Sequence, residues 1–384
     1  MSTTAEWTDD QLGLRDAIER LGPELSAGHV QDDRAGTFRR DKWEKLAQTG
    51  IFGLPVGAAA GGLGQDLRTT MFVLEGLGKA CRDGGLNFSA TTHLASTVTP
   101  LARFGSAALK QRLLPDAIAG SVIGAHAITE PSAGSDAMSL RTAAVATADG
   151  SRYVLNGSKA FVSNGPIADV VVVYARTGQQ GSATGTTAIV VERDRRGLSF
   201  GAPIAKMGLG SAPLCELFLD DVEVPSENVL GKPGLGFLVL DHVMKREILY
   251  SFVVNVGEMD NRLHATIEYA KQRHQFGQPI SSFQSVANKI VDIKIALETS
   301  RHWLYATAAK LQSGRDVTVD MAIAKILVSD YALSTALAAV QLLGGYGYMA
   351  EYGVEKDLRN AVAGTIYSGT NDIQRTRIAA MLGL

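Results

Sequence analysis

The 384-residue sequence has little of what marks secreted, membrane-spanning or nucleic-acid-binding proteins. Its two cysteines, Cys81 and Cys215, lie far apart without a second Cys or His at ligand spacing, which excludes a disulfide framework and a Cys-based metal site. His93 falls on an apolar helical face, which favours a packed histidine over a metal ligand. The formal net charge is −2, and no overall basic excess suggests nucleic acid. The N-terminus has no basic start followed by an apolar run, and no apolar run approaches the length of a membrane span. We therefore expect a cytoplasmic protein that acts without a metal, a membrane or nucleic acid.

The spacing of apolar residues changes twice along the chain, and this divides it into three regions. Residues 1–120 have helical spacing, and Thr8 with Gln11 can form a capping box ahead of the first helix. Two further helices are expected over residues 71–81 and 88–104. An N-terminal helical domain is the prediction for this region.

Residues 121–232 carry short β-branched or apolar segments bounded by Gly, Pro, Asn or Asp, which predict a β-barrel-like middle domain. These segments are residues 153–157, 170–175, 187–192 and 214–218. Residues 233–384 return to helical spacing and suit a C-terminal four-helix bundle. Its long helical segments are residues 237–273, 282–313 and 317–344. The predicted fold class is therefore mainly α with a central β-domain.

One stretch near the C-terminus carries the main functional signal. Residues 366–374 read IYSGTNDIQ, a run that resembles the Ile-Tyr-Glu-Gly-Thr-Asn-Glu-Ile-Gln signature of the flavin-dependent acyl-CoA dehydrogenases. In that family the first glutamate of the signature is the catalytic base, and here Ser368 takes its place. A serine hydroxyl without an activating neighbour cannot accept a carbon-bound proton near neutral pH, whereas a tuned carboxylate can. Either the base lies elsewhere, or the chain does not perform the family's reaction.

Two further runs resemble the elements that hold the flavin ring in this family. Residues 127–136 read AITEPSAGSD, and the resemblance implies that Ile128 and Thr129 contact the edge of the isoalloxazine ring, where hydrogen-bond donors tune its reactivity. The same run places Ser135 beside the carrier arm of a thioester. Taken alone, this stretch could also be an ordinary turn.

The second run, residues 156–165, reads NGSKAFVSNG. Phe161 stands where the family has a tryptophan beside the flavin, and Ser163 stands where it has a threonine that bonds the flavin. An ordinary hairpin with a packed aromatic residue is the alternative. The resemblance covers nearly the whole chain, in the same order of helical, β and helical regions.

Motifs in the C-terminal region resemble those that bind the adenosine diphosphate half of FAD. The resemblance implies that Arg273 contacts the pyrophosphate of a flavin in a neighbouring subunit. Compensation of the helix dipole would also explain an arginine at this helix end. The resemblance therefore implies FAD and a homotetramer, or at least a dimer. The remaining residues that it assigns to FAD are Phe276, Gln284, Gln341, Gly344, Gly345, Thr370 and Asp372.

In the isovaleryl and long-chain branches of the family, the base comes from the first bundle helix. Counting back along that helix from Arg273 and Phe276 gives Glu247. A mostly apolar run follows it, so we expect Glu247 to head a buried helix face and to be the catalytic base. The alternative is a solvated glutamate paired with Lys245 or Arg246.

The same helix departs from the pattern of enzymes that bind coenzyme A. Those enzymes carry Asp two residues before the base and Arg just after it, where this chain has Lys245 and Ile248. Several runs, such as residues 81–89 and 283–288, resemble the prolyl-carrier-protein dehydrogenase branch more closely. We expect an acyl or aminoacyl thioester on a carrier protein's phosphopantetheine, or on coenzyme A. The expected substrate-binding residues are Ser135, Arg246, Ser368 and Gly369; for Arg246 a solvated basic pair is an equal alternative.

The expected function is FAD-dependent α,β-dehydrogenation, with hydride transfer to flavin N5 and reoxidation by an electron-transfer flavoprotein or oxygen. Three alternatives remain open. The chain could be an ordinary acyl-CoA dehydrogenase of catabolism, a flavin monooxygenase on the same fold, or a silent flavoprotein that acts by interaction.

Overall fold

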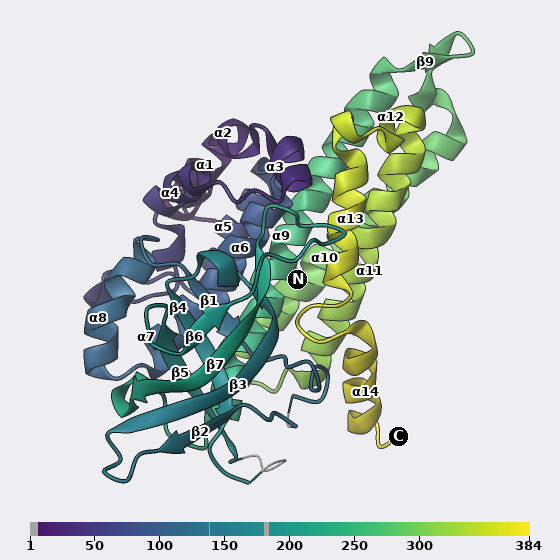
Figure 1. The fold of residues 1–384 in the computed structure, drawn as a ribbon. Coiled ribbons are helices and arrows are strands. Elements are labelled where there is room, and N and C mark those ends of the chain that lie inside the picture. The colour runs from purple at the N-terminus through teal and green to yellow at the C-terminus, as the bar shows by residue number, and fades with distance from the viewer. Residues whose placement is uncertain (1–6, 138, 180–183) are drawn as a thin grey trace.

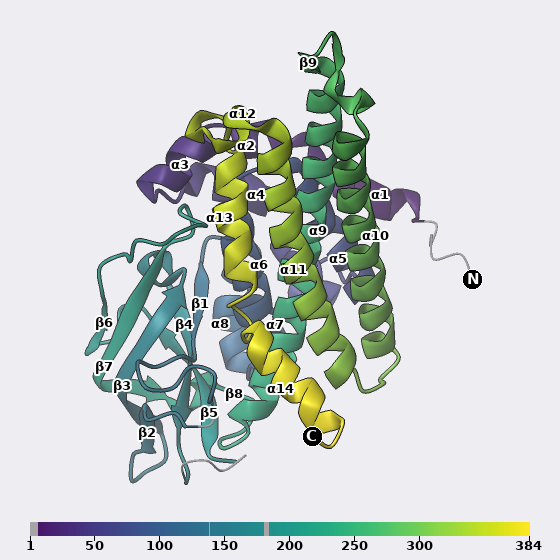
Figure 2. The same ribbon diagram turned by 90° about the vertical axis from the view of Figure 1, so that its right-hand side faces the viewer.

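The protein is described by a computed structural model that covers residues 7–137, 139–179 and 184–384. A group of short helices, a twisted sheet and a bundle of long helices pack against one another (Figure 1; Figure 2 shows the bundle face-on). This arrangement confirms the predicted fold class. Residues 178–185 read GQQGSATG, which predicts a flexible surface turn, and this stretch lies partly outside the described residues.

The N-terminal region is helical, as expected. A π-helical turn at Leu94–Val98 connects Gly84–His93 and Thr99–Phe104 without a break in helical structure. Turns of 3-10 helix occur at Ile51–Gly53 and Ala58–Ala60. The helices are α1 (Asp9–Arg20), α2 (Gly22–Ser26), α3 (His29–Ala35), α4 (Arg40–Gln48), α5 (Leu67–Ala80), α6 (Gly84–His93), α7 (Thr99–Phe104) and α8 (Ala107–Ile118).

Helix starts in this region follow local capping chemistry. The predicted capping box is present, because the amide of Gln11 donates to Thr8 Oγ1 at 3.3 Å and the amide of Thr8 donates to Gln11 Oε1 at 2.9 Å. Helix α5 begins four residues before the predicted start, because the Asp66 carboxylate accepts from the amide of Thr69 at 2.7 Å.

An eight-stranded sheet forms the middle of the molecule, and the four predicted segments all lie in its strands. The strand order is β6-β7-β3-β2-β4-β5-β8, with β1 paired beside β4. The strands are β1 (Gly124–Ala127), β2 (Ala143–Ala146), β3 (Arg152–Ser163), β4 (Val170–Arg176), β5 (Thr186–Glu192), β6 (Leu198–Phe200), β7 (Leu214–Pro225) and β8 (Val229–Leu230).

The register of β1 on β4 decides which side chains face the helices. The two strands run parallel, and His126 lies opposite Val172. Because side chains alternate between the two faces of a sheet, His126, Val172 and Tyr174 project from the same face. Val172 and Tyr174 belong to the core that the sheet shares with the helices, whereas Val171 and Val173 belong to a separate core on the other face.

The C-terminal region contains three long helices, and their ends agree with the predicted segments to within two residues. A small hairpin projects where α9 and α10 meet (Figure 2). The elements are α9 (Gly236–Gln272), β9 (His274–Gln275), β10 (Gln278–Pro279), α10 (Gln284–Gln312), α11 (Thr318–Leu343), α12 (Gly345–Tyr348), α13 (Val354–Gly364) and α14 (Asn371–Met381).

Helix α11 corrects one expectation from the sequence. It has a mean hydropathy of 1.6 over an 18-residue window, which by length and composition alone is enough to cross a membrane. It packs against α9, α10, α13 and α14, and 44% of that window is buried inside the bundle. One of its charged side chains, Lys325, is fully buried and donates to Asn371 Oδ1 at 2.7 Å. Its apolar character therefore has a packing explanation as the central helix of the bundle.

Candidate active site

Glu247 lies where α9 passes between the sheet and the C-terminal helices, and it is only 7% exposed. Its Oε1 accepts a hydrogen bond of 2.6 Å from the hydroxyl of Ser368. Its Oε2 lies 3.4 Å from His126 Nε2, which is longer than an ordinary hydrogen bond, and has no hydrogen-bond partner in the described part of the chain. Lys245 instead pairs with Asp241 at 2.6 Å. The carboxylate is thus buried, held at one oxygen and unpaired at the other.

The loop between α13 and α14 presents Ser368 to this carboxylate. Ser368 has a φ of 56° and Gly369 a φ of 82°, so both residues adopt the left-handed backbone conformation. The Gln374 side chain donates to the carbonyl of Ser368 at 3.0 Å, and Thr370 caps α14 by accepting from the amide of Ile373 at 3.2 Å. The Gln374 side chain thus holds the backbone of Ser368, and the Thr370 cap fixes the start of the helix that follows it.

The two runs expected to hold the flavin ring lie side by side. The amide of Ala160 donates to the carbonyl of Thr129 at 2.9 Å, and Lys159 Nζ donates to the carbonyl of Ile128 at 3.0 Å. Lys159 is fully buried and also pairs with Glu130 at 2.8 Å. Burial lowers the pKa of Lys159 to about 8, although the Glu130 carboxylate acts to raise it. This buried pair ties the turn after β1 to strand β3.

A bulge in β3 then turns Phe161 outward. The pairing of β3 with β7 shifts register between Lys159 and Val162, and Phe161 has a φ of 56°. Phe161 is 66% exposed, and Ser163 is half-buried at the end of the same strand. An exposed aromatic face beside hydroxyl and backbone groups fits the flat ring of a flavin. Ser135 is exposed in the loop that follows β1, as a contact to a thioester arm would require.

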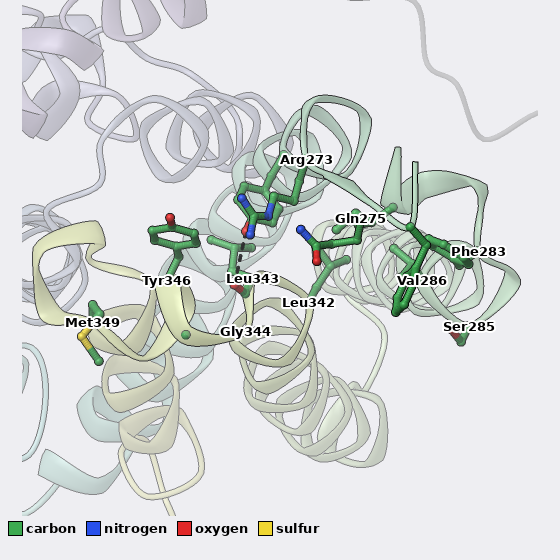
Figure 3. Close-up of a pocket in the computed structure, with 14 residues that line it drawn as sticks. Arg273, Gln275, Phe283, Ser285, Val286, Leu342, Leu343, Gly344, Tyr346 and Met349 are labelled. Atoms are coloured by element: carbon green, nitrogen blue, oxygen red, sulfur yellow. Dashed lines mark hydrogen bonds between the residues drawn. The ribbon is translucent and has the colours of Figure 1, made fainter. Parts of the chain in front are cut away.

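A second group of expected cofactor residues lies at the opposite end of α9, around a cavity of about 830 Å³ (Figure 3). Arg273, Phe276, Gly344 and Gly345 line it, whereas Gln284 and Gln341 are adjacent in sequence to lining residues. A Cβ placed on Gly344 or Gly345 would meet nothing within 4 Å, so the backbone there is open to a ligand.

Arg273 is exposed at this cavity, and its guanidinium lies 5.6 Å from the ring centre of Tyr346, which the sequence did not single out. Glycine backbone, an arginine and aromatic side chains fit the diphosphate and base of a dinucleotide. Between Glu247 and Arg273 the helix rises ~1.5 Å per residue, so the two groups of residues lie about 39 Å apart along α9.

Three residues near Glu247 were missed by the sequence reasoning. His126 approaches its Oε2, and the buried hydroxyl of Tyr174 has no hydrogen-bond partner among the described residues. The pKa of Tyr174 is raised, first by burial and then by the charge of Glu247. Tyr367 donates to Asn255 Oδ1 at 3.2 Å, and its pKa is raised by burial and by nearby carboxylates. His126 lies two residues before Ile128, and period-two alternation in β1 was the available signal.

Arg246, expected to contact substrate, is half-buried on α9 and makes no hydrogen bond or ion pair within the described ranges. Burial and the neighbouring Arg103 lower its pKa. His242, one turn earlier, has its pKa lowered to about 3 by burial and by Arg246 and Arg103. Three basic side chains, Arg103, Lys245 and Arg246, act on one another or on His242 here, and Asp241 is the acidic side chain near them. Asp372, assigned to FAD from the sequence, is exposed and lies 3.6 Å from Arg375.

Comparison with known proteins finds a consistent set of similarities. The family models described as the N-terminal, middle and C-terminal domains of acyl-CoA dehydrogenase match residues 8–121, 125–222 and 234–383. An L-prolyl-[peptidyl-carrier protein] dehydrogenase from Serratia sp. is 40% identical over 342 residues, covering 89% of this chain and 88% of the relative. A short-chain-specific acyl-CoA dehydrogenase from Megasphaera elsdenii is 36% identical over 371 residues, covering 96% of each. The solved structure described as PigA with FAD and proline shares 35% identity and a TM-score of 0.94, covering 100% of both chains.

Proposed function

Because the chain belongs to the acyl-CoA dehydrogenase family, we propose that it oxidises the α,β carbon–carbon bond of an acyl or aminoacyl thioester. The family, the fold and the FAD cofactor expected from the motifs are confirmed, and the chain is an FAD-dependent oxidoreductase. The identity of the base, the carrier of the acyl group and the assembly are our own proposals.

The arrangement of Glu247 is the single observation that carries the proposed reaction. FAD, when bound, supplies the acceptor for a hydride from the β-carbon. Glu247 removes the α-proton with Oε2, the oxygen that has no hydrogen-bond partner among the described residues. Ser368 holds the other oxygen at 2.6 Å, so the base needs little reorganisation when substrate arrives. A flavin monooxygenase has no need of such a base, which favours dehydrogenation over that alternative.

The acyl group, in our proposal, is carried on the phosphopantetheine of a carrier protein. The Serratia relative is named for a prolyl group on a peptidyl-carrier protein, and prolyl is therefore the first aminoacyl group to test. Where enzymes that bind coenzyme A have Arg after the base, Ile248 is buried and apolar, and Lys245 is already paired with Asp241. The unpaired Arg246 is the candidate to meet phosphate or acidic groups of the carrier. Electrons would leave to an electron-transfer flavoprotein or to oxygen.

The separation of the two groups of cofactor residues supports a homotetramer, or at least a dimer. About 39 Å of helix lies between Glu247 and Arg273, which is longer than one extended dinucleotide. The flavin end and the diphosphate end of one FAD therefore contact different subunits, and Arg273 serves a neighbour's cofactor. We place the enzyme in the cytoplasm, where the free and buried Cys81 and Cys215 stay reduced.

Anaerobic single turnover tests the proposal. The FAD-loaded enzyme is mixed with prolyl and butyryl thioesters, each on a carrier protein and on coenzyme A, and flavin absorbance is followed. We expect bleaching, fastest with an aminoacyl carrier-protein thioester. Equal or faster bleaching with coenzyme A thioesters would identify an ordinary acyl-CoA dehydrogenase. No bleaching by any of these thioesters would refute the proposal, and so would incorporation of oxygen into the product in a parallel incubation under air.

A further inference from the structure

Strand β3 carries a buried lysine whose charge is directed at the peptide group between Ile128 and Thr129. Lys159 is fully buried, and its Nζ donates to the carbonyl of Ile128 at 3.0 Å and to Glu130 Oε1 at 2.8 Å. A buried cation is costly unless it is paired, and a buried ion pair adds little stability over well-packed apolar side chains. A gain in stability therefore does not explain why a charge lies here.

A separate contact already holds the turn after β1 on strand β3. The amide of Ala160 donates to the carbonyl of Thr129 at 2.9 Å. This hydrogen bond joins two backbone groups and needs no charged side chain. If Lys159 served only to tie the two segments together, it would duplicate this bond.

The ion pair of Lys159 and Glu130 has its positive end at Ile128 and its negative end at the start of β2. Glu130 Oε2 accepts from the amide of Arg141 at 2.7 Å, and its Oε1 accepts from the amide of Thr142 at 2.9 Å. The carboxylate is thus held by backbone donors as well as by the lysine. Burial lowers the pKa of Lys159 to about 8 and Glu130 acts to raise it, so the side chain is an ammonium ion at pH 7.

The carbonyl of Ile128 and the amide of Thr129 belong to one peptide group. An ammonium ion on the carbonyl oxygen polarises this group and makes its N–H a stronger hydrogen-bond donor. The amide of Thr129 makes no hydrogen bond to the described part of the chain, and Thr129 is only half-buried. This N–H is therefore available to a ligand, at the two residues that the sequence motif assigns to the edge of the flavin ring.

We propose that Lys159 is a positioning residue that acts through this peptide group to favour the reduced form of the bound FAD. Reduction adds negative charge to the flavin ring, and a preorganised donor at the ring edge stabilises that charge. The inference rests on the FAD-dependent function proposed above, and it adds a residue that sets how readily the flavin accepts a hydride. It requires no contact between Lys159 and FAD.

Neutral substitution of both members of the pair provides the test, because removal of Lys159 alone would leave Glu130 buried and uncompensated. In Lys159→Met/Glu130→Gln, the glutamine oxygen can still accept from the amides at the start of β2. The FAD-loaded protein, without substrate, is titrated anaerobically with dithionite beside a two-electron reference dye of known potential. At a fixed state of the dye, the ratio of reduced to oxidised FAD should be about tenfold lower than in the parent, which is about 30 mV for a two-electron couple.

Lys42 provides a matched control at another buried ion pair. It is 3% exposed, and its Nζ lies 2.8 Å from Asp32 Oδ2, as Lys159 Nζ does from Glu130. It belongs to α4, which carries none of the residues assigned to FAD. Lys42→Met/Asp32→Asn should therefore keep the parent ratio of reduced to oxidised FAD. FAD content and melting temperature show that each variant is folded and loaded.

Three results would overturn the inference. One is a folded, FAD-loaded Lys159→Met/Glu130→Gln variant with the parent ratio, and another is an equal fall in the Lys42 control. The third is a variant that folds without FAD, which would give the pair a role in binding alone. If this variant does not fold, Lys159→Gln/Glu130→Gln takes its place; failure of both to fold would assign the pair to the fold and likewise overturn the inference.

The dye titration uses no thioester, so its result is independent of the thioester experiment that tests the proposed function. The expected fall in the ratio, together with no bleaching by any thioester, would refute the proposed function and leave this inference standing. Bleaching by a thioester, together with an unchanged ratio in the folded variant, would leave the function standing and refute the inference.

Discussion

The hydroxyl of Ser368 donates a 2.6 Å hydrogen bond to Oε1 of Glu247, although 121 positions separate the two residues in sequence. Ser368 stands where the C-terminal signature that this chain resembles carries a base, and Glu247 is the residue that we propose as the base. Because their side chains meet, the two positions reach the same point in space from different elements. A carboxylate at either position would therefore reach the same substrate.

Glu247→Gln should keep FAD and bind substrate, yet reduce its flavin about 10²- to 10⁴-fold more slowly, which is the usual contribution of a general base. The amide keeps the size of the side chain but cannot accept the α-proton. Single-turnover stopped-flow absorbance separates this chemical step from binding and reoxidation. Glu268→Gln, on the exposed part of the same helix, is the matched control and should reduce flavin at the parent rate. A Glu247→Gln variant as fast as the parent would move the base elsewhere.

Ser368→Ala should leave the maximal rate of flavin reduction within a few-fold of the parent, because that hydroxyl accepts no proton. Its loss removes the hydrogen bond that holds Oε1 of Glu247, so any effect on the rate reflects the position of the carboxylate alone. The measurement is the rate of anaerobic flavin reduction at saturating substrate. A loss as large as that of Glu247→Gln would show that the serine takes part in proton transfer.

The limits of the long helices could be predicted from the sequence because they depend on local patterns. Apolar spacing over residues 237–273 predicted α9 at Gly236–Gln272, and the capping box of Thr8 and Gln11 placed the first helix. The burial of Glu247 was also predicted from the apolar run that follows it. Each of these inferences uses residues within a few turns of one another.

Features that depend on which segments pair could not be predicted in this way. His126 and Tyr174 share a face because β1 pairs with β4 in a register that places His126 opposite Val172, and no local pattern predicts that register. The hydrogen bond between Ser368 and Glu247 needs the loop after α13 to cross α9, and the contact of Arg273 with Tyr346 needs α9 to end beside α12. These contacts follow from packing over long sequence separations.

The free energy of unfolding should fall in acid partly because of His93. Burial lowers its pKa to about 4, and both ring nitrogens are paired, Nδ1 with the amide of Gly124 at 3.0 Å and Nε2 with the carbonyl of Ala117 at 2.9 Å. The unfolded histidine, with a pKa of about 6.5, binds more protons over the interval between the two values. This contribution is complete above pH 6.5 and is lost as the pH falls toward 4, by about 3 kcal/mol in total.

Urea unfolding of the FAD-loaded protein at pH 7, 6 and 5, at one protein concentration, measures this dependence. His93→Gln should be less stable at pH 7 but lose less stability on acidification, by up to about 1.4 kcal/mol per pH unit. His29 and His242 also have lowered pKa values, so some dependence remains in the variant. An unchanged slope in His93→Gln would show that His93 is not the group that titrates.

Mixing two inactive variants tests whether Arg273 serves a neighbouring subunit. Arg273→Ala alone should weaken FAD binding by about 10- to 100-fold, because it removes a charge-assisted contact to the diphosphate. In the mixed assembly with Glu247→Gln, an intact Glu247 from one chain can combine with an intact Arg273 from its neighbour. If FAD lies across two subunits, random 1:1 reassembly should restore about a quarter of the sites. The measurement is flavin reduction at limiting FAD on the unselected mixture, after equal co-expression of the two variants; different purification tags on the two chains confirm that mixed oligomers form. If Arg273 acted on the FAD of its own chain, no site would combine the two intact residues and the mixture would stay inactive; a monomeric mass with full FAD occupancy would refute the shared site directly.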